Sequence, residues 1–264
     1  MKLLIVLLFG LIAMTASANE WVPPEKPDLQ AILSEVSKDR KAGRYELALG
    51  KLIWFHENAL KHDRSMSAVR LSFALADWHR LGQEYPPALE KLKQVREETR
   101  KRITADDAKN VSFEDFHELT AFNRELNEWD DTVDMFKFVE KHNPEAAERI
   151  YGVSEPALLK AKEYALCNKY LGPDKSVSRA LELFNLESER EVGIKYAERH
   201  KQFQNDRFIK DAATLVALLV INDRKGEAGK AVHDFKTVEA DADFHEKLAS
   251  ALDKALAGEL PEQR

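Results

Sequence analysis

From Asp28 onward, apolar residues recur at the three- and four-residue spacing of amphipathic helices, and no alternating run is long enough for a strand. The composition agrees with this pattern: of 264 residues, 10 are glycine and 9 are proline, while 44% are hydrophobic and 33% are charged. Because sheets use glycine and proline in their turns, this balance favours long helices with charged outer faces. The sequence therefore predicts an all-α fold with a substantial core.

The first 18 residues have the three parts of a secretory signal peptide. Lys2 gives a positive start, Leu3–Met14 form an apolar stretch, and Ala16–Ala18 is a small-x-small cleavage site. Since this stretch is shorter than the roughly 20 residues that span a bilayer, a cleaved signal is favoured over an uncut membrane helix. We expect cleavage after Ala18, a periplasmic or secreted mature chain with no membrane insertion, and a proline-rich tether over residues 19–27.

Helical patterns follow one another through the rest of the chain. Their starts are marked by N-cap signals such as Asp28, Ser65 and Ser112. The longest interruptions are expected at residues 103–111 and 143–153. We expect helices over residues 28–42, 45–61, 66–81, 86–102, 113–126, 129–142, 155–170, 176–201 (with a break near Asn185 considered), 206–222, 227–240 and 243–257.

The expected helices come in pairs that are joined by similar hairpins. In the first hairpin Gly43 is followed five residues later by Ala48, and in the last Gly226 is followed by Ala231. A glycine can close a helix in the left-handed conformation, and a small alanine lets the next helix pack closely. With changes in loop length or residue type, the pattern has the anchors Gly43, Gly82, Asn127, Gly172 and Gly226 and the small residues Ala48, Ala88, Thr132, Ala180 and Ala231.

This hairpin resembles the tetratricopeptide repeat, which has a small residue at its turn, two aromatic positions and a closing proline. Trp129, Phe136 and Pro144 occupy such positions after Asn127, and Tyr45 occupies the first aromatic position of the first unit. The anchors are 39, 45, 45 and 54 residues apart, whereas the family repeats about every 34 residues. Longer helices or loops are therefore implied, and HEAT-like repeats of about 40–47 residues are the structural alternative.

The resemblance implies a right-handed α-solenoid of roughly five antiparallel helix pairs. The array would form a single domain over residues 28–264. Its last helix would cap the stack with apolar residues at helical spacing, namely Phe244, Leu248, Leu252 and Leu256.

Residue types that commonly carry catalysis do not form a recognisable set in this sequence. The eight histidines are scattered, and none forms a helical zinc motif. Cys167, the only cysteine, lies in an apolar helical stretch where a buried, inert thiol is expected. Residues 239–246 resemble a calcium loop at three positions but lack its glycine, and Leu252 stands where a glutamate ligand would be. We therefore expect no enzymatic activity, no metal and no cofactor.

Basic residues stand just before the expected hairpins. In tetratricopeptide arrays the first helix of each pair lines the concave face, so stacking would place these residues in one row. Such a row would suit a carboxylate or an acidic peptide, although the formal net charge of −6 gives no general attraction to nucleic acid or anionic membranes. Cations also oppose the dipole at helix C-termini, which is the alternative explanation. The candidate partner-binding residues are Arg40, His79, Arg80, Arg124, Lys169 and Arg224.

These features predict an exported adaptor or scaffold that presents a concave helical groove to a peptide or protein partner, including an acidic one. Two alternatives stay open. A solute-binding accessory protein of an envelope transport system would need a closed cavity lined by aromatic residues. An enzyme built on a helical-repeat scaffold would need a pocket in which titratable groups converge.

Overall fold

The computed structural model describes residues 21–188 and 193–262. Every regular element in these ranges is a helix, and no strand occurs in them, so the predicted all-α class is confirmed. None of the described helices combines the length and the apolar character that crossing a bilayer requires. The expected signal peptide, residues 1–18, lies outside the described residues, and its cleavage stays a prediction.

The chain divides into two compact units. The first unit comprises the residues up to Arg100 together with Ala121–Asn127, and the second comprises Lys101–Thr120 and the residues from Glu128 onward. The expectation of one repeat domain running through residues 28–264 stays a prediction.

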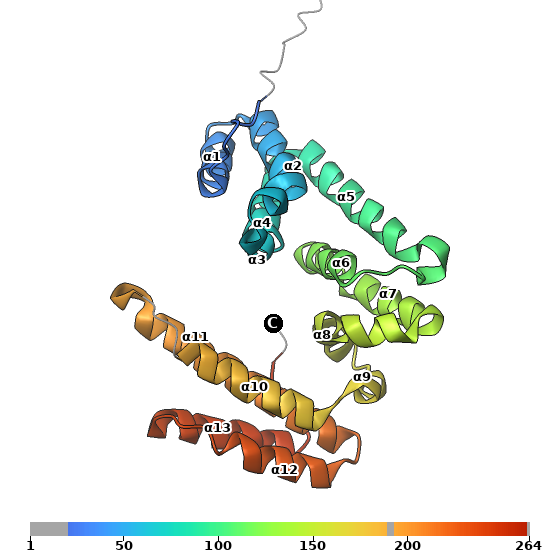
Figure 1. The fold of residues 1–264 in the computed structure, drawn as a ribbon, viewed down its shortest axis with the longest axis vertical. Coiled ribbons are helices and arrows are strands. Elements are labelled where there is room, and N and C mark those ends of the chain that lie inside the picture. Colours follow the sequence, from blue (N-terminus) through green and yellow to red (C-terminus); the bar gives the residue numbers. More distant parts are fainter. Residues whose placement is uncertain (1–20, 189–192, 263–264) are drawn as a thin grey trace, which may run out of the picture. The chain divides into compact units, whose positions relative to one another are not determined.

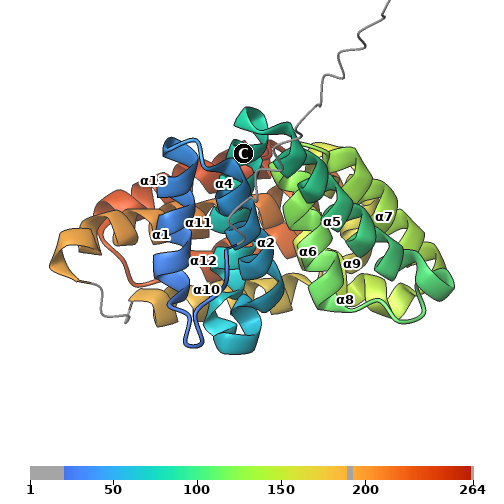
Figure 2. The ribbon, with the colours of Figure 1, turned by 90° about the horizontal axis from the view of Figure 1, so that it is seen from above.

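The first unit is built around the buried side chains of Leu52, Trp78, Leu81 and Phe122. The indole Nε1 of Trp78 donates to the carbonyl of Ala88 over 2.9 Å and so fixes one helix against the next. The first two helices pack side by side (Figure 2). The helices of this unit are α1 (Leu29–Lys41), α2 (Tyr45–His62), α3 (Ser67–Arg70), α4 (Phe73–Glu84), most of α5 (Pro86–Thr104) and the end of α6 (Phe113–Glu125).

The second unit is centred on the long helix α11. Its residues 212–219 are all buried, because α9, α10, α12 and α13 pack around it; α10 to α13 are seen together in Figure 1. The unit also contains the end of α5, a short helical turn at Ala105–Ala108 and the first part of α6. Its other helices are α7 (Trp129–His142), α8 (Pro144–Lys160), α9 (Tyr164–Tyr170), α10 (Pro173–Ser188), α11 (Ile194–Ile221), α12 (Lys225–Phe235) and α13 (Ala242–Leu256).

Four helix predictions need correction. The segment 66–81 is not one helix, because the chain breaks at Leu71–Ser72 between α3 and α4. Residues 143–153 are no interruption: Asn143 caps α8 through its side chain, and the helix continues through Pro156. The helix expected over 155–170 is broken at Ala161–Glu163, where Lys162 has a φ of 60°. The break expected at residues 202–205 is absent from α11.

The structure agrees with the hairpin pattern at the predicted small residues, but at only two of the five predicted helix caps. Ala48, Ala88, Thr132 and Ala231 are buried and Ala180 is half-buried, as their packing role requires. Gly43 and Asn127 have the predicted positive φ, 73° and 57°. The other three caps were wrong: Gly82 lies inside α4, Gly226 lies inside α12 and Gly172 has no positive φ. The left-handed residue before α12 is Asp223, with a φ of 59°, because α11 ends there.

The last helix, α13, packs against α11. Phe244, Leu248 and Leu252 are buried, in agreement with their helical spacing. Leu256 departs from the expectation, since it is 42% exposed at the end of the helix.

Candidate functional site

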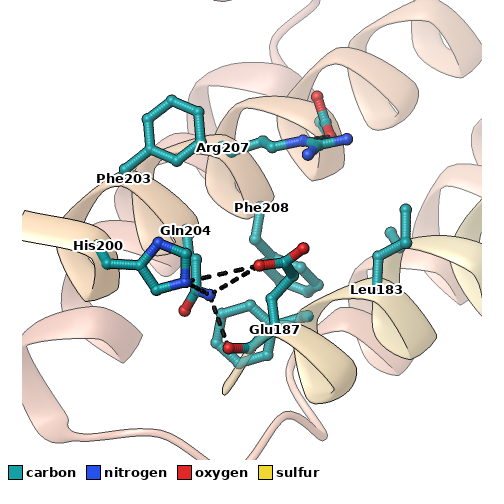
Figure 3. Close-up of a pocket in the computed structure, with 10 residues that line it drawn as sticks. Leu183, Glu187, His200, Phe203, Gln204, Arg207 and Phe208 are labelled. Carbon is teal, nitrogen blue, oxygen red and sulfur yellow. Dashed lines mark hydrogen bonds and ion pairs between the residues drawn. The ribbon is translucent and has the colours of Figure 1, made fainter. Parts of the chain in front are cut away.

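A pocket of about 230 Å³ lies between α10 and α11 of the second unit (Figure 3). In Figure 3, Leu183 and Glu187 from one helix face His200, Gln204 and Arg207 from the other. The pocket is lined by Ala180, Leu183, Phe184, Glu187, His200, Phe203, Gln204, Arg207, Phe208 and Asp211.

The floor of the pocket belongs to the core of the second unit. Phe184 and Phe208 have ring centroids 4.7 Å apart, and both pack on Phe244 of α13, at 5.3 and 5.8 Å. Phe208 also meets the ring of Phe235 edge to face at 5.6 Å. Aromatic pairs at such distances are favourable beyond their buried area. The floor is therefore a fixed apolar surface.

The rim of the pocket carries apolar side chains that water can reach. Phe203 is 64% exposed and Leu183 is 37% exposed. Leu186, one helical turn beyond Leu183 on α10, is 58% exposed. Exposed apolar side chains that gather around a hollow commonly mark a binding surface, whereas single ones need no explanation.

Polar groups close one end of the pocket. The side-chain amide of Gln204 donates to the backbone carbonyl of Glu187 over 2.7 Å. The same amide nitrogen lies 2.6 Å from Nε2 of His200 and donates to it in the neutral tautomer that carries its proton on Nδ1. Nε2 of His200 is 3.5 Å from a carboxylate oxygen of Glu187. These three side chains hold one another in place.

The other end of the pocket holds a loose ion pair. Nε of Arg207 lies 3.7 Å from Oδ2 of Asp211, one turn along α11, and both side chains are more than half exposed. Although the carboxyl group of Asp211 faces the hollow, the surrounding protein raises its pKa by desolvation. Arg207 and Lys210 oppose this rise. On balance the pKa of Asp211 lies above its ordinary value of 3.8.

A second acid interacts with Asp211 from α8. Burial raises the pKa of Glu155, the charge of Asp211 raises it further, and a hydrogen bond from the hydroxyl of Tyr151, over 2.7 Å, lowers it. Cys167 interacts with this group and is fully buried. Burial raises the pKa of its thiol to about 12, and the expected burial of the only cysteine is confirmed, while its inertness stays a prediction.

The pocket combines an aromatic floor, an apolar rim and charged ends, so it can hold a small apolar group that is flanked by polar atoms. Among the residues described, no group of histidine, cysteine, aspartate and glutamate side chains could hold a metal ion.

The first four candidate basic residues belong to the first unit, and each contacts a neighbour there. Arg40 of α1 forms an ion pair with Glu84 of α4. Nδ1 of His79 lies 3.3 Å from a carboxylate oxygen of Glu125 on α6. Both contacts tie one helix to another.

Arg80 and Arg124 also have contacts within the first unit. Arg80 pairs with Asp77 of its own helix at 2.5 Å. Arg124 donates to the carbonyl of Leu71 over 2.8 Å, at the break between α3 and α4.

Lys169 and Arg224 belong to the second unit. Lys169 of α9 pairs with Glu140 of α7. Arg224 pairs with Glu227 at 2.7 Å and donates to the side-chain oxygen of Asn168 over 2.9 Å. Because the six residues are shared between two units, the row that they would form in a repeat array stays a prediction.

The pocket itself was missed from the sequence. The helix expected over residues 176–201, for which a break near Asn185 was considered, did not place Glu187 and His200 opposite each other, whereas they face each other from α10 and α11. The signal that could have revealed it is the surplus of apolar residues on charged helices, namely Leu183, Leu186 and Phe203. A core explains apolar positions on one face only, and these three exceed what that face needs.

In comparisons with known proteins, no family model, no curated protein and no solved structure matches this chain.

Proposed function

We propose that this chain is an exported interaction module that binds a protein or peptide partner and receives an apolar side chain of that partner in the α10–α11 pocket. The observation that carries the proposal is the coincidence of the pocket with exposed apolar residues. Leu183 and Phe203 line the hollow and remain open to water. Covering them on binding would remove apolar surface from water, which is the main favourable term in most protein association.

The size of the pocket favours a single side chain over a larger group. An engineered protein cavity of about 150 Å³ binds benzene, and sites for drug-sized ligands and cofactors occupy about 300–1,000 Å³. A volume of about 230 Å³ therefore suits one aromatic or large aliphatic side chain. Anchors of this kind, seated in a preformed pocket, dominate the binding energy of many interfaces.

The wider proposal rests on the sequence. The signal-like N-terminus supports export to a periplasmic or extracellular space, and the repeated hairpins support a tetratricopeptide-like solenoid with a groove. The basic residues from Arg40 to Arg224 support an acidic partner for that groove. No reaction is assigned to the chain, because Glu187, His200 and Gln204 satisfy one another. Intact-mass measurement of the exported protein tests the first step, since a mature chain that still carried Lys2 would contradict cleavage after Ala18.

A matched pair of variants tests the pocket. Phe203→Ser removes an exposed apolar side chain at the pocket, and Phe73→Ser removes one that is 73% exposed on α4 of the other unit. Partners are recovered from the native envelope fraction with the wild-type protein and with each variant, and are then compared by mass spectrometry. We expect a partner that is retained by the wild type and by Phe73→Ser but lost with Phe203→Ser. Equal recovery with all three proteins would contradict a role for the pocket.

The second candidate function is the binding of a small solute. The three phenylalanines around the pocket, Phe184, Phe203 and Phe208, favour it. In that case small aromatic compounds at millimolar concentration should raise the melting temperature of the wild type and not that of Phe203→Ser, since a ligand of the native state stabilises it. A peptide that binds with a Kd far below that of every such compound would favour the interaction module over solute binding.

A further inference from the structure

We propose that residues 21–27 are a releasable strap, whose Trp21 occupies a docking site on α1 and α2 for an extended, proline-rich partner segment that carries a tryptophan. The site lies in the first unit, so it is separate from the α10–α11 pocket and goes beyond the proposed function. Three observations carry it: the seat of Trp21, the few other contacts of the strap, and a site whose groups are held in place without the strap.

Trp21 is half-buried against the apolar cluster that α1, α2 and α4 form. Its indole meets that of Trp54 edge to face, with ring centroids 5.7 Å apart, and Nζ of Lys51 lies over its ring, 5.8 Å from the centroid. Edge-to-face pairs and cations within about 6 Å of a ring face both stabilise an aromatic side chain. The site therefore recognises an aromatic ring by apolar contact, by ring geometry and by charge.

Few contacts hold the rest of the strap. Within the described part of the chain, no hydrogen bond joins residues 21–27 to the helices. The three prolines of the strap have no amide hydrogen to donate, and they favour an extended backbone. Val22, next to Trp21, is 77% exposed. The strap is thus anchored mainly by Trp21, and its release requires the loss of one large side-chain contact.

The site is held in place by contacts that do not involve the strap. Nζ of Lys51 forms ion pairs with Glu35 at 2.6 Å and with Asp39 at 2.7 Å, so this buried cation keeps its partners when the strap leaves. The ring of Trp54 also packs on that of His62, with centroids 5.6 Å apart. A preorganised site loses little binding free energy to ordering. It can therefore receive a second segment in place of the strap.

The occupant of the site indicates the chemistry of the partner. Proline-rich segments adopt the extended polyproline II conformation at a low entropy cost, and aromatic-lined grooves are a common way to bind them. Because a short linker joins the strap to the first unit, its effective concentration at the site is on the order of 1 mM. A partner must compete with the strap, and its apparent affinity falls with the fraction of molecules in which the site is open.

A fluorescently labelled peptide that copies residues 19–27 tests the inference. Its Kd is measured by anisotropy for the wild type, for Trp21→Ala, which empties the site, and for Trp21→Ala/Trp54→Ala, which also removes the facing ring. The control Val22→Ala shortens an exposed side chain of the same strap. A second peptide has alanine in place of its tryptophan, and circular dichroism checks that each variant is folded.

We expect the peptide to bind Trp21→Ala at least about fivefold more tightly than the wild type or Val22→Ala, because no strap competes in that variant. The alanine peptide should not bind, and Trp21→Ala/Trp54→Ala should bind the tryptophan peptide at least about fivefold more weakly than Trp21→Ala does. Equal Kd values for the wild type and Trp21→Ala would overturn the strap. The absence of binding to a folded Trp21→Ala would overturn the docking site.

The wild type itself gives a second measurement, which holds even if Trp21→Ala does not fold. After incorporation of fluorotryptophan, the fluorine signal of Trp21 is assigned by its absence in Trp21→Phe. This signal should shift when the peptide is added at millimolar concentration, and an unchanged signal would overturn the release of the strap. A dimer of the wild type in sedimentation that Trp21→Ala does not form would overturn a foreign partner, since two copies would then exchange their straps.

Discussion

The side-chain amide of Asn143 donates to the carbonyl of Ala108 over 2.9 Å, while its oxygen accepts from the backbone N–H of Ala146 over 3.1 Å. Asn143 thus caps α8 and holds the turn that precedes α6. That turn is unusual, because Asp106, Asp107 and Ala108 have φ values of 49°, 52° and 59°. The left-handed conformation costs a residue with a side chain about 1–2 kcal/mol. Asn143 is one contact that stabilises it.

Two substitutions separate these roles of Asn143. Asn143→Asp keeps the acceptor for Ala146 and removes the donor to Ala108, whereas Asn143→Ala removes both. A lost cap costs about 1 kcal/mol, and a lost hydrogen bond costs a similar amount, about 1 kcal/mol. We expect urea unfolding to rank the wild type above Asn143→Asp and Asn143→Ala last, about 2 kcal/mol below the wild type. Equal stability of the two variants would show that the bond to Ala108 contributes nothing.

Ala231 reports on the packing of the last hairpin. It is 2% exposed on α12, which packs against α10 and α11. Ala231→Leu should overpack this contact and lower the free energy of unfolding by about 1–3 kcal/mol. The control Ala165→Leu lies on the exposed side of α9 and should change stability by less than about 0.5 kcal/mol. An unchanged free energy of unfolding for Ala231→Leu would mean that the contact between these helices has space for the larger side chain.

Gly82 is required by a close approach and not by its backbone conformation. An added Cβ would stand 2.9 Å from Cβ of Leu89 and 3.0 Å from its Cα and N. Backbone atoms cannot yield easily, so Gly82→Ala should destabilise the first unit by about 1–3 kcal/mol. Gly50 lies inside α2 with nothing within 4 Å of such an atom. Gly50→Ala should therefore stabilise by about 0.5–1 kcal/mol, as expected for a helix interior. Thermal unfolding of both variants would check the contrast, and a shift in the same direction for both would contradict it.

Gly82 also shows how far the sequence could predict the fold. The helical class follows from apolar spacing, which every helix must satisfy to bury its face. The hairpin anchors are harder, because glycine serves two purposes. It closes α1 at Gly43 with a positive φ, and at Gly82 it lets Leu89 approach inside a helix. The residue type is the same, and only tertiary contacts distinguish the two roles.

The pocket was beyond sequence reasoning for a related reason. It depends on where α10 stops and α11 starts, and helix ends are set by capping and packing as much as by local preference. Once the two helices are separate, Glu187 and His200 face each other from α10 and α11. The helix start expected at residue 155 was wrong for the same reason, since α8 tolerates Pro156 in its interior while Ile150 and Leu158 stay buried.

Glu155 gives a prediction about pH. Burial raises its pKa in the folded protein above the ordinary value of 4.5. The folded state therefore binds this proton more tightly than the unfolded state, so the contribution to stability is full below pH 4.5 and is lost as pH rises through the folded pKa. The glutamine in Glu155→Gln cannot ionise, so this variant does not lose stability as pH rises. Its side-chain oxygen can still accept the hydrogen bond from the hydroxyl of Tyr151.

We expect Glu155→Gln to be more stable than the wild type at pH 7, with the difference shrinking toward pH 4. Urea unfolding at pH 4, 5.5 and 7 would measure it. The control Glu148→Gln changes an exposed acid of the same helix and should show no such trend. If the stability difference between Glu155→Gln and the wild type stayed constant over the three pH values, the titration of Glu155 would not be its cause.

A separate prediction concerns the row of basic residues from Arg40 to Arg224 and its partner. Arg80 is exposed and pairs with Asp77 one turn earlier on its own helix, so its replacement by glutamate should cost little stability, about 0.2–0.5 kcal/mol. Arg124 is less suitable for a test, because its reversal also removes a hydrogen bond to Leu71. If the row binds an acidic partner, Arg80→Glu should lower the affinity for that partner about tenfold, because an attractive charge is replaced by a repulsive one.

The control for Arg80→Glu is Arg64→Glu, which reverses an exposed charge of the same unit outside the row. The affinities of both variants for the native partner are measured at two salt concentrations. A general charge effect should lower both affinities alike and should fade as salt rises, because exposed charges are screened over about 8 Å at physiological ionic strength. A loss confined to Arg80→Glu would support the row. Equal affinities would leave the cations with the structural role that their ion pairs already describe, and would leave the α10–α11 pocket as the binding surface. Combining Arg80→Glu with Phe203→Ser then asks whether one partner touches both: losses that add up in free energy indicate two independent contacts on the same partner.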